Sequence, residues 1–587
     1  MKKKNPPKAK KKKVKLTPEQ KILIRKQRRH TSDFANLFRN LDFTRVKSDK
    51  VQIIFEGRSG EIDEIFFYEN IILLVEVTVG KGGGDHLFPK KPLFDKIHNN
   101  QSAFVQYAKE TYPALKSGLR SIYAPDDFQV KIIYASLEEV NSEHMQNCPN
   151  IHFIQGGTKK YFLSLAKTIH KSARIEFFNF LEIEWNAIGE NAINSQTKST
   201  TYEGHLLPEG NSSYPDGYKI VSFYADPESL ISQCYVLRRD GWRDDAGLYQ
   251  RVLVPKKISN MRRYLVDEKR VFVNNVIVTL PSDTVMNIAG SSGKNIPSTD
   301  LKKAKQISIS IPAGYNNIGI VDGQHRVFCY HEGIDTLDSK IDELRKRQNL
   351  LVTGIVYPDG TSETERRAFE AKLFLEINDN QTRTRSALRQ DIEVIVRPFL
   401  GIAVAKRVMQ GLSKKGPYTG LFQSSYFDAP NKIKTSSIVS YGLRPLVKFD
   451  GTDSLYHAWE NPDKHRLKER EKKRQKDSKY TNDLKILEAY IEYCIAKIND
   501  FFIAAKLGYG PQNWTIEGEE KSALLTPTAV NGLIACLRKV IDQDLSLNLA
   551  AHKKHLGKIG SLKFSTYKSS NWQSLGEKIF KDYYTKT

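Results

Sequence analysis

The chain has 587 residues, of which 91 are Lys or Arg and 67 are Asp or Glu, so its formal net charge is +24. A hydrophobic fraction of 40% is enough for buried cores, which excludes a chain that is disordered throughout. The apolar runs are strand-sized and the five cysteines form no CxxC pair, which excludes an integral membrane protein and argues against a disulfide framework. With no apolar signal segment after the first lysines, we expect a cytoplasmic protein of roughly three or four domains.

The positive charge is concentrated in two tracts. Residues 1–30 hold 14 basic side chains and one acidic one, and residues 464–479 hold nine basic and three acidic ones. Such tracts are either solvated, self-repelling segments or the footprint of a polyanion, since Lys-rich arms gain affinity by releasing phosphate counterions. Neither tract interleaves apolar residues at helical spacing, which disfavours a membrane surface. We therefore predict DNA as the partner.

The first part of the chain reads as a disordered basic tail over residues 1–16 and an α/β domain over 17–185. Thr17 and Pro18 have the pattern of a helix start, and that helix is predicted to run toward Leu41. The other predicted elements are strands over 51–55, 61–68, 71–79, 130–134 and 151–154, with helices over 88–115 and 161–169.

A polar segment over 186–235 is predicted to be a linker. It is followed by a second α/β domain over 236–460, a basic linker over 461–483 and a helical region over 484–587. Strands are predicted over 271–278, 306–311, 318–321 and 351–357. Ser362 with Glu365 forms a capping box that begins a helix, and Thr526–Pro527 begins another in the last region.

Two acidic residues mark the first candidate site. Asp63 and Glu76 lie on neighbouring predicted strands joined by a short turn, so their carboxylates are expected to meet on one face. Two carboxylates in such a position can hold Mg²⁺ (or Mn²⁺) against a phosphate. The alternative is an amphipathic hairpin with two ordinary surface acids.

This order of elements, with Asp63 and then Glu76-Val77-Thr78, resembles the PD-(D/E)xK nuclease superfamily, whose fold is that of restriction endonucleases. The resemblance implies metal-dependent DNA cleavage at Asp63 and Glu76. Thr78 stands where the family has its lysine, so Lys81 is the candidate for that catalytic role. Otherwise the domain is an inactive DNA-binding relative. Gln101 and Gln106 occupy the region where many relatives carry an auxiliary Gln. A weaker rival is an HNH-type site formed by Asp85, His86, His98 and Asn99.

The second candidate site is the segment Asp322-Gly323-Gln324-His325-Arg326, which joins an apolar strand to a helix. Free backbone N–H groups at a helix start attract anions, and a neighbouring Arg and His would clamp a phosphate. The alternative is an Asp-capped helix with exposed polar residues.

The pentapeptide resembles the signature of the DGQHR-domain family, which includes DndB-like proteins of DNA phosphorothioation systems, over roughly residues 236–400. More distantly, the order of elements is similar to the ParB/sulfiredoxin-like α+β fold, in which two polar segments hold a nucleotide. Carried over, the resemblance implies that a phosphate or a nucleoside triphosphate is bound by Asp322, Gly323, Gln324, His325, Arg326, Asn378, Asn380, Gln381 and Arg383.

The sequence thus predicts a multidomain α/β protein that acts on DNA in a prokaryotic DNA-modification or anti-phage system. One hypothesis is an Mg²⁺-dependent endonuclease, with or without nucleotide hydrolysis, coupled to the DGQHR domain. The alternative is a DndB-like regulator that binds DNA without cutting it. Thr78 favours the regulator, whereas Asp63 with Glu76 favours the enzyme. Either protein is free to form oligomers.

Overall fold

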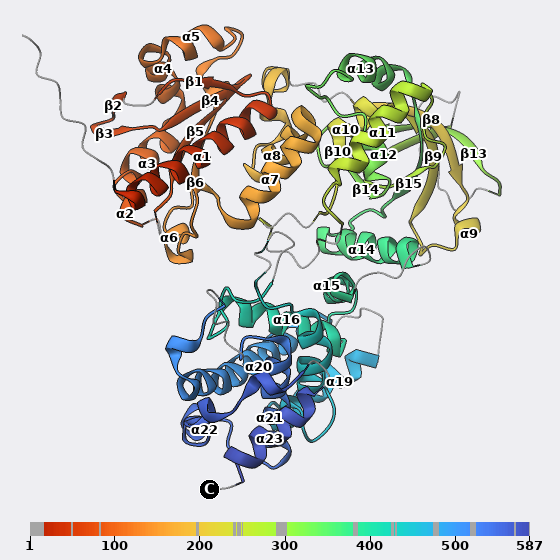
Figure 1. Ribbon diagram of the computed structural model, residues 1–587. Coiled ribbons are helices and arrows are strands. Elements are labelled where there is room, and N and C mark those ends of the chain that lie inside the picture. Colours follow the sequence, from red (N-terminus) through yellow and green to blue (C-terminus); the bar gives the residue numbers. More distant parts are fainter. Residues whose placement is uncertain are drawn as a thin grey trace, which may run out of the picture. The chain divides into compact units, whose positions relative to one another are not determined.

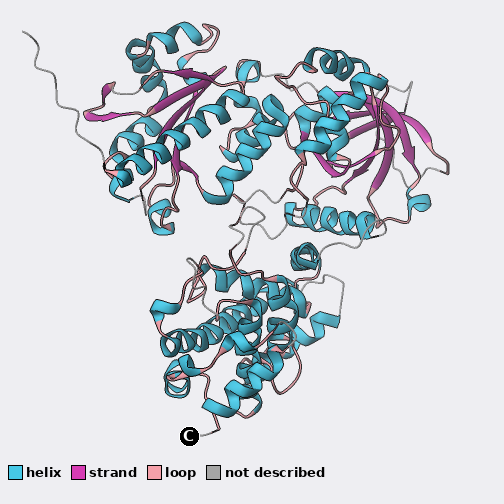
Figure 2. Cartoon of the chain, viewed as in Figure 1, coloured by secondary structure: helices cyan, strands magenta, loops and turns pink. Residues whose placement is uncertain are grey.

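The computed structural model describes residues 17–585 except 49–50, 81–83, 195–198, 239–241, 244–247, 249, 289–301, 380–385, 424–427, 429–430, 473–479, 517–523 and 569–570. The chain divides into two compact units, Met1–Thr197 with His331–Asp338, and Lys198–Tyr330 with Ser339–Thr587. Helices are mixed with strands in several sheets (Figures 1 and 2), which confirms the predicted α/β class. No helix in the described ranges is both long and apolar enough to cross a membrane.

The first unit contains a five-stranded sheet in the order β1-β4-β5-β6-β7. β4 is antiparallel to β1 and β5, whereas β5, β6 and β7 run parallel. These strands are β1 (Thr44–Val46), β4 (Glu64–Tyr68), β5 (Ile71–Thr78), β6 (Gln129–Ser136) and β7 (Ile151–Ile154). A separate ribbon pairs β2 (Gln52–Phe55) with β3 (Arg58–Glu61).

Helices flank this sheet, and the first and last of the helices predicted for this unit are present. The predicted first helix is α1 (Pro18–Asn40), and it begins with a capping box between Thr17 and Gln20. The remaining α-helices of the unit are α2 (Gly84–Leu87), α3 (Lys91–Asn99), α4 (Gln101–Thr111), α5 (Pro113–Gly118), α6 (Ser142–Gln146), α7 (Gly156–Ile169) and α8 (Arg174–Phe180). The predicted helix over 88–115 is thus divided into three, and α6 and α8 were not predicted.

Strand β5 lies at the centre of the sheet and is buried along its whole length. On one face its Ile72 and Leu74 share a core with Phe94 of α3 and Phe104 of α4. On the other face, Phe38 of α1 packs against Phe66 of β4, with ring centroids 4.6 Å apart. Since side chains alternate along a strand, the residue two positions after Leu74 points toward the α3 side of the sheet.

The second unit begins with an eight-stranded sheet in the order β10-β14-β11-β15-β9-β8-β13-β12. Its strands are β8 (Thr200–Leu207), β9 (Lys219–Ala225), β10 (Cys234–Tyr235), β11 (Val276–Leu280), β12 (Val285–Ile288), β13 (Lys305–Ile311), β14 (Ile318–Asp322) and β15 (Leu350–Val356). Its α-helices are α9 (Glu209–Ser212), α10 (Pro227–Gln233), α11 (Pro255–Glu268), α12 (Gln324–Phe328), α13 (Asp338–Arg347) and α14 (Glu363–Asp379), the last of which has the predicted Ser362–Glu365 capping box.

The predicted linker over 186–235 is replaced by strands and helices from Thr200 onward. β8 and β9 occupy interior positions of the eight-stranded sheet and pair with each other. In β8, Tyr202, Gly204 and Leu206 are buried while their neighbours are exposed, which is the alternation of a half-buried strand. The Ser, Thr and Gly content of the segment concealed this two-residue period.

After β15 the described residues that form regular structure are helical, and the helical part begins earlier than predicted. One hydrophobic core includes residues from Phe399 to Tyr584. The basic tract 461–483 is also partly built into it, since Leu467 is buried and Arg470 forms a buried ion pair with Asp483. The charge run therefore did not mark a boundary. The helices are α15 (Ser386–Val396), α16 (Gly401–Lys414), α17 (Arg444–Val447), α18 (Leu455–Ala458), α19 (His465–Lys472), α20 (Tyr480–Tyr509), α21 (Pro527–Asp542), α22 (Leu549–Leu556) and α23 (Trp572–Tyr583).

Candidate metal centre

The two predicted acids meet at the edge of the first sheet where the parallel strands end. Asp63 lies just before β4, and Glu76 lies near the end of β5 on the side that faces α3. The Val77 backbone N–H donates to Asp63 Oδ2 over 2.9 Å, which fixes the Asp63 carboxylate beside β5. His86 of α2 joins them, and one potential ligand atom from each of the three residues lies within 4.8 Å of the others. Within the described ranges this is the only such group of three.

Glu76 is the most unusual member of this group. Its side chain is only 1% exposed, and its Oε1 has no hydrogen-bond partner in the part of the chain that the structure describes. Burial, together with the neighbouring Asp63 carboxylate, raises the pKa of Glu76 to about 8, although Lys90 acts in the opposite direction. A buried carboxylate with a vacant acceptor oxygen is costly unless a cation or a proton compensates it.

Lys90 supplies a positive charge that the sequence analysis did not assign. It is the N-cap residue of α3, and its Nζ contacts Glu76 Oε2 and lies 3.8 Å from Asp63 Oδ1. The same amine is 3.4 Å from the Glu61 carbonyl oxygen. Lys90 thus stands beside both carboxylates, which is the position that the sequence analysis assigned to Lys81.

The two residues considered for the lysine role give different outcomes. Thr78 is buried, and its Oγ1 accepts a hydrogen bond from the Gly80 N–H, so no amine comes from that position. Lys81 lies outside the described residues. The only signal for Lys90 in the sequence is the Lys90-Lys91-Pro92 segment, which marks the start of a helix but does not specify the face of the sheet that this helix covers.

His86 is held in place by β6. Its Nδ1 lies 3.1 Å from the Tyr134 hydroxyl, and Tyr134 is the residue opposite Glu76 in the parallel pairing of β5 and β6. Burial lowers the pKa of His86, and Lys90 lowers it further, so the imidazole is neutral near pH 7. A neutral imidazole can accept a proton or bind a metal.

The other side chains proposed for this region do not join the group. Asp85, His98 and Asn99 of the HNH alternative are exposed, and only His86 of that set reaches the two carboxylates. Gln101 accepts from the Val130 N–H at the opposite end of β6 from Ser136. Gln106 is exposed on α4. The auxiliary role expected of these glutamines is therefore not supported, because α4 begins at the wrong end of the sheet.

The second predicted site has the expected backbone but not the expected side-chain freedom. Gly323 follows β14 with φ of 99°, a left-handed conformation that favours glycine, and α12 begins at the next residue. α12 has only five residues, and the four polar side chains around Gly323 bind within the protein. A short helix of this kind offers little dipole for an anion.

Arg326 and Gln324 show how the turn is held. Arg326 Nη2 donates to Asp322 Oδ2 and to the Asn275 carbonyl, both over 2.8 Å, although its Nε is buried without an acceptor. Gln324 is 8% exposed and accepts from Arg238 Nε over 3.0 Å while donating to the Arg251 carbonyl over 3.1 Å. These contacts favour the structural alternative over a phosphate clamp.

His325 does not supply a cation either. The Val254 N–H donates to its Nε2 over 3.3 Å, and burial together with the charges of Lys257 and Arg238 lowers the pKa of His325 to about 4. Of the predicted downstream residues, Asn378 donates to the Phe374 carbonyl of its own helix α14. The others, Asn380, Gln381 and Arg383, lie outside the described residues.

Comparison with known proteins adds no identity to this geometry. The chain matches no family model, and it is not significantly similar to any curated protein or solved structure that was compared with it. The function is therefore inferred from the geometry around Asp63, Glu76, His86 and Lys90.

Proposed function

We propose that the first unit hydrolyses phosphodiester bonds in DNA with the help of a divalent cation held by Asp63 and Glu76. The observation that carries this proposal is the buried Glu76 carboxylate, whose Oε1 has no partner in the described structure and which lies beside a second carboxylate. Natural proteins retain such a costly arrangement where a site needs it.

The residues present fit Mg²⁺ or Mn²⁺. Asp63 and Glu76 offer the oxygen ligands that both ions prefer, and the His86 imidazole is better suited to Mn²⁺. A bound ion would lower the pKa of a coordinated water and neutralise charge on the scissile phosphate. Glu76 must lose its proton to act as a ligand, so binding is expected to strengthen as the pH rises toward about 8.

Lys90 and His86 have separate roles in this proposal. The Lys90 ammonium, held by Glu76, is placed to orient an attacking water and to stabilise negative charge that develops on the phosphate. His86 is neutral, so it can accept the proton that the water loses, with Tyr134 fixing the orientation of the ring. Tyr134 has a pKa raised to about 12, mainly by burial, and keeps its proton.

The test is to incubate supercoiled plasmid with the full chain and Mg²⁺ or Mn²⁺. Asp63→Ala and Glu76→Ala are expected to abolish nicking while DNA affinity is nearly unchanged, because each removes a metal ligand. Glu61→Ala is the matched control, since Glu61 is an exposed acid of the adjacent strand β3. Nicking that survives Glu76→Ala would contradict the proposal.

A second candidate is a regulator that binds DNA without cutting it. The specific observation in its favour is the Lys90 amine, which already compensates part of the charge on Asp63 and Glu76. In that case Lys90 forms a structural ion pair with Asp63 and Glu76, and neither Mg²⁺ nor Mn²⁺ would change the stability of the protein. Tight DNA binding together with no nicking in either metal would favour this candidate, as would unaltered stability after Mg²⁺ or Mn²⁺ is added.

A further inference from the structure

The first half of α1 stands free of the rest of its unit. Every residue of 18–29 is exposed except Ile24, which is half-buried, whereas His30, Phe34 and Phe38 in the second half are buried. Even Ile22 is 54% exposed. The helix is therefore anchored by its C-terminal half and projects three turns beyond the core.

The direction of this projection follows from the contacts of the anchored half. Phe38 packs on Phe66, which pairs with Leu73 early in β5. His30 Nε2 lies 3.0 Å from the Ala135 carbonyl, and Ala135 pairs with Val77 near the end of β5. Thus α1 runs opposite to β5, and residues 18–29 extend past the sheet edge that holds Glu76.

Basic side chains form a stripe along the projecting segment. Lys21, Arg25, Arg28 and Ser32 follow one another at helical spacing, and so lie on one face. In the described part of the chain none of the three cations forms an ion pair with a carboxylate. From Lys21 to Ser32 the stripe is about 16 Å long, which is enough for its three cations to reach successive phosphates of one DNA strand.

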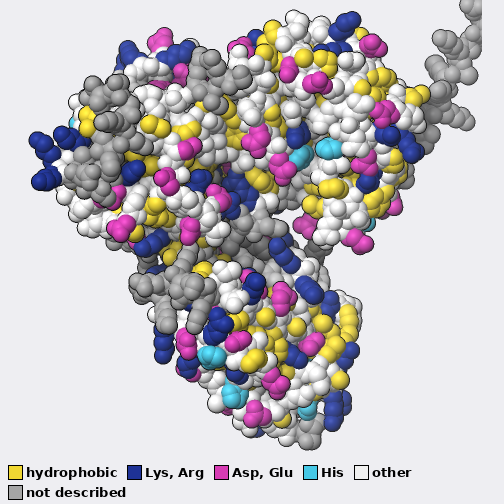
Figure 3. Space-filling model, turned by 180° about the vertical axis from the view of Figure 1, so that it is seen from behind, with side chains coloured by type: hydrophobic (Ala, Val, Ile, Leu, Met, Phe, Trp, Pro, Cys, Tyr) yellow, Lys and Arg dark blue, Asp and Glu magenta, His cyan; other side chains and the backbone are white. Residues whose placement is uncertain are grey.

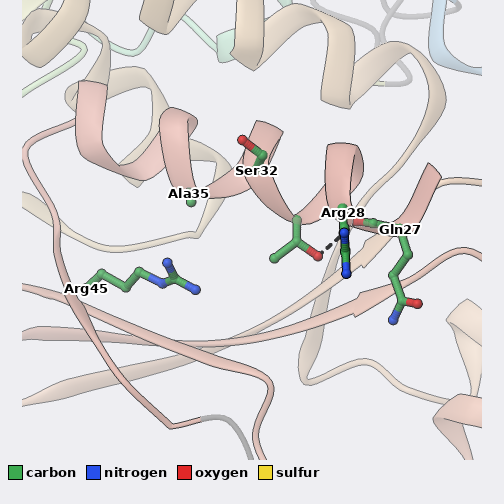
Figure 4. A pocket seen from close by; sticks show the side chains of 6 residues that line it. Gln27, Arg28, Ser32, Ala35 and Arg45 are labelled. Carbon is green, nitrogen blue, oxygen red and sulfur yellow. Dashed lines mark hydrogen bonds between the residues drawn. The ribbon is translucent and has the colours of Figure 1, made fainter. Parts of the chain in front are cut away.

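The stripe leads into a hollow between α1 and β1, lined by Gln27, Arg28, Thr31, Ser32, Ala35 and Arg45. Figure 4 shows Arg28 and Gln27 leaving α1 on the side toward which the Arg45 guanidinium extends. Arg45 is 52% exposed, and its Nε donates to the buried Glu64 carboxylate over 2.6 Å. Glu64 thus fixes the guanidinium while the exposed part can donate to a phosphate.

We propose that the projecting half of α1, with the hollow at its base, is the arm that binds the phosphate backbone of DNA at the cluster edge. The identity of the polyanion rests on the proposed function, whereas the cationic arm does not. On the face drawn in Figure 3, Lys and Arg side chains lie among Asp and Glu side chains. In the sequence, residues 1–16 before α1 contain nine further lysines.

The test compares two full-length variants that lose the same charge. One carries Lys21→Gln, Arg25→Gln and Arg28→Gln, and the control carries Lys553→Gln, Lys554→Gln and Lys558→Gln at exposed positions of the other unit. Glutamine keeps the helix, because its helix propensity is close to those of Lys and Arg. Circular dichroism verifies that both variants are folded.

The measurement is the affinity for a fluorescent DNA duplex between about 50 and 200 mM salt. We expect the α1 variant to bind more weakly and to lose roughly 2.7 from the slope of log K on log salt, about 0.9 for each phosphate contact. The control should keep the wild-type slope. Equal slopes for the two variants would overturn the proposal, and so would a wild type that does not bind DNA.

Two further outcomes separate this proposal from its neighbours. If the α1 variant loses binding to phosphatidylserine vesicles and keeps its DNA affinity, the arm is a membrane contact and the proposal is overturned. If wild type binds DNA through α1 but never nicks it with Mg²⁺ or Mn²⁺, the arm stands and the hydrolytic proposal fails. Loss of nicking in Glu76→Ala at unchanged DNA affinity, together with weaker DNA binding by the α1 variant, supports both.

Discussion

The two candidate sites of this chain are both built at the end of a buried strand, yet they differ in how their polar groups are satisfied. Around Gly323, the Gln324 amide bonds to Arg238 and to the Arg251 carbonyl, and Arg326 Nη2 bonds to Asp322 and to the Asn275 carbonyl, although Arg326 Nε is buried without an acceptor in the described structure. At the end of β5, Glu76 keeps a buried oxygen without a partner in the described structure. The bonds around Gly323 stabilise a turn, whereas the free oxygen of Glu76 can accept a proton or bind a cation.

In this chain the 322–326 motif is therefore a weaker guide to function than the buried Glu76 carboxyl group. The 322–326 segment is the more specific sequence pattern, but its His325 is held neutral and its Arg326 is paired. Asp63 and Glu76 form a much shorter pattern, but burial raises the pKa of Glu76 to about 8. A group perturbed in this way is typical of functional sites.

The largest effect expected is on catalysis at the first site. If Lys90 acts on the water and the phosphate, Lys90→Ala should lower the nicking rate by about 10²–10³-fold, the range for loss of one electrostatic or acid–base group. The variant's pH–rate profile should also shift to higher pH, because Lys90 carries a positive charge that lowers the pKa of Glu76.

Lys91→Ala is the matched control for this prediction, since Lys91 pairs with Asp95 along α3. Its nicking rate should stay near the wild-type value. Adding Thr78→Lys to Lys90→Ala asks whether an amine from β5 can replace the one from α3, and partial recovery is the expected result. Equal rates for Lys90→Ala and Lys91→Ala would remove Lys90 from the mechanism.

Lys90 was not predicted from the sequence, for a physical reason. The hairpin of β4 and β5 is local, so the meeting of Asp63 with Glu76 follows from strand alternation and a short turn. Lys90 reaches Glu76 only because α3 packs on that face of the sheet, which is a tertiary contact. No local pattern specifies where the residues between β5 and α3 lead the chain.

The same distinction explains the fold. The starts of α1, α14 and α21 were predicted because capping groups act within one helical turn. Long-range assembly was not predicted: β8 and β9 join a sheet with strands far along the chain, and Phe399 shares a core with Tyr584. Composition did not show where the eight-stranded sheet or the helical core begins, because burial, and not local polarity, defines these limits.

At the second site we expect a substitution of Gln324 to lower the stability of the protein and not to abolish the binding of a ligand. Gln324→Ala removes the acceptor of Arg238 Nε, and Arg238 is 1% exposed. Leaving a buried charged donor without this partner should cost about 2–3 kcal/mol. Hydrogen exchange of the β14 amides measures the change, and Gln543→Ala at an exposed position of the same unit is the control.

A different result would reverse the reading of this turn. If Gln324→Ala leaves β14 protection unchanged while wild type binds ATP, GTP or CTP with Mg²⁺ and the variant does not, the segment is a ligand site. The phosphate interpretation of the sequence analysis would then replace the structural one.

The smallest effect expected is a gain of stability at the first site when its charge is removed. The pKa of Glu76 is about 8 in the folded chain against 4.5 as its ordinary value, so the protonated form favours folding. That contribution is complete below pH about 4.5 and is lost as the pH rises through about 8. Glu76→Gln cannot ionise, and it should therefore exceed wild type in stability by a margin that grows over this interval.

At pH 8.5 the free energy of unfolding of Glu76→Gln should exceed that of wild type by at least about 1.4 kcal/mol, the equivalent of one pKa unit. This minimum is set low because Lys90 loses its ionised partner in the variant, which offsets part of the stabilisation. Hydrogen exchange of the β5 amides, corrected for the intrinsic rate at each pH, gives the measurement. Mg²⁺ or Mn²⁺ should narrow the difference by binding ionised Glu76 in wild type alone. If the margin is constant with pH, Glu76 is already ionised at low pH, Lys90 fully compensates it, and the cluster is the structural ion pair of the regulator hypothesis.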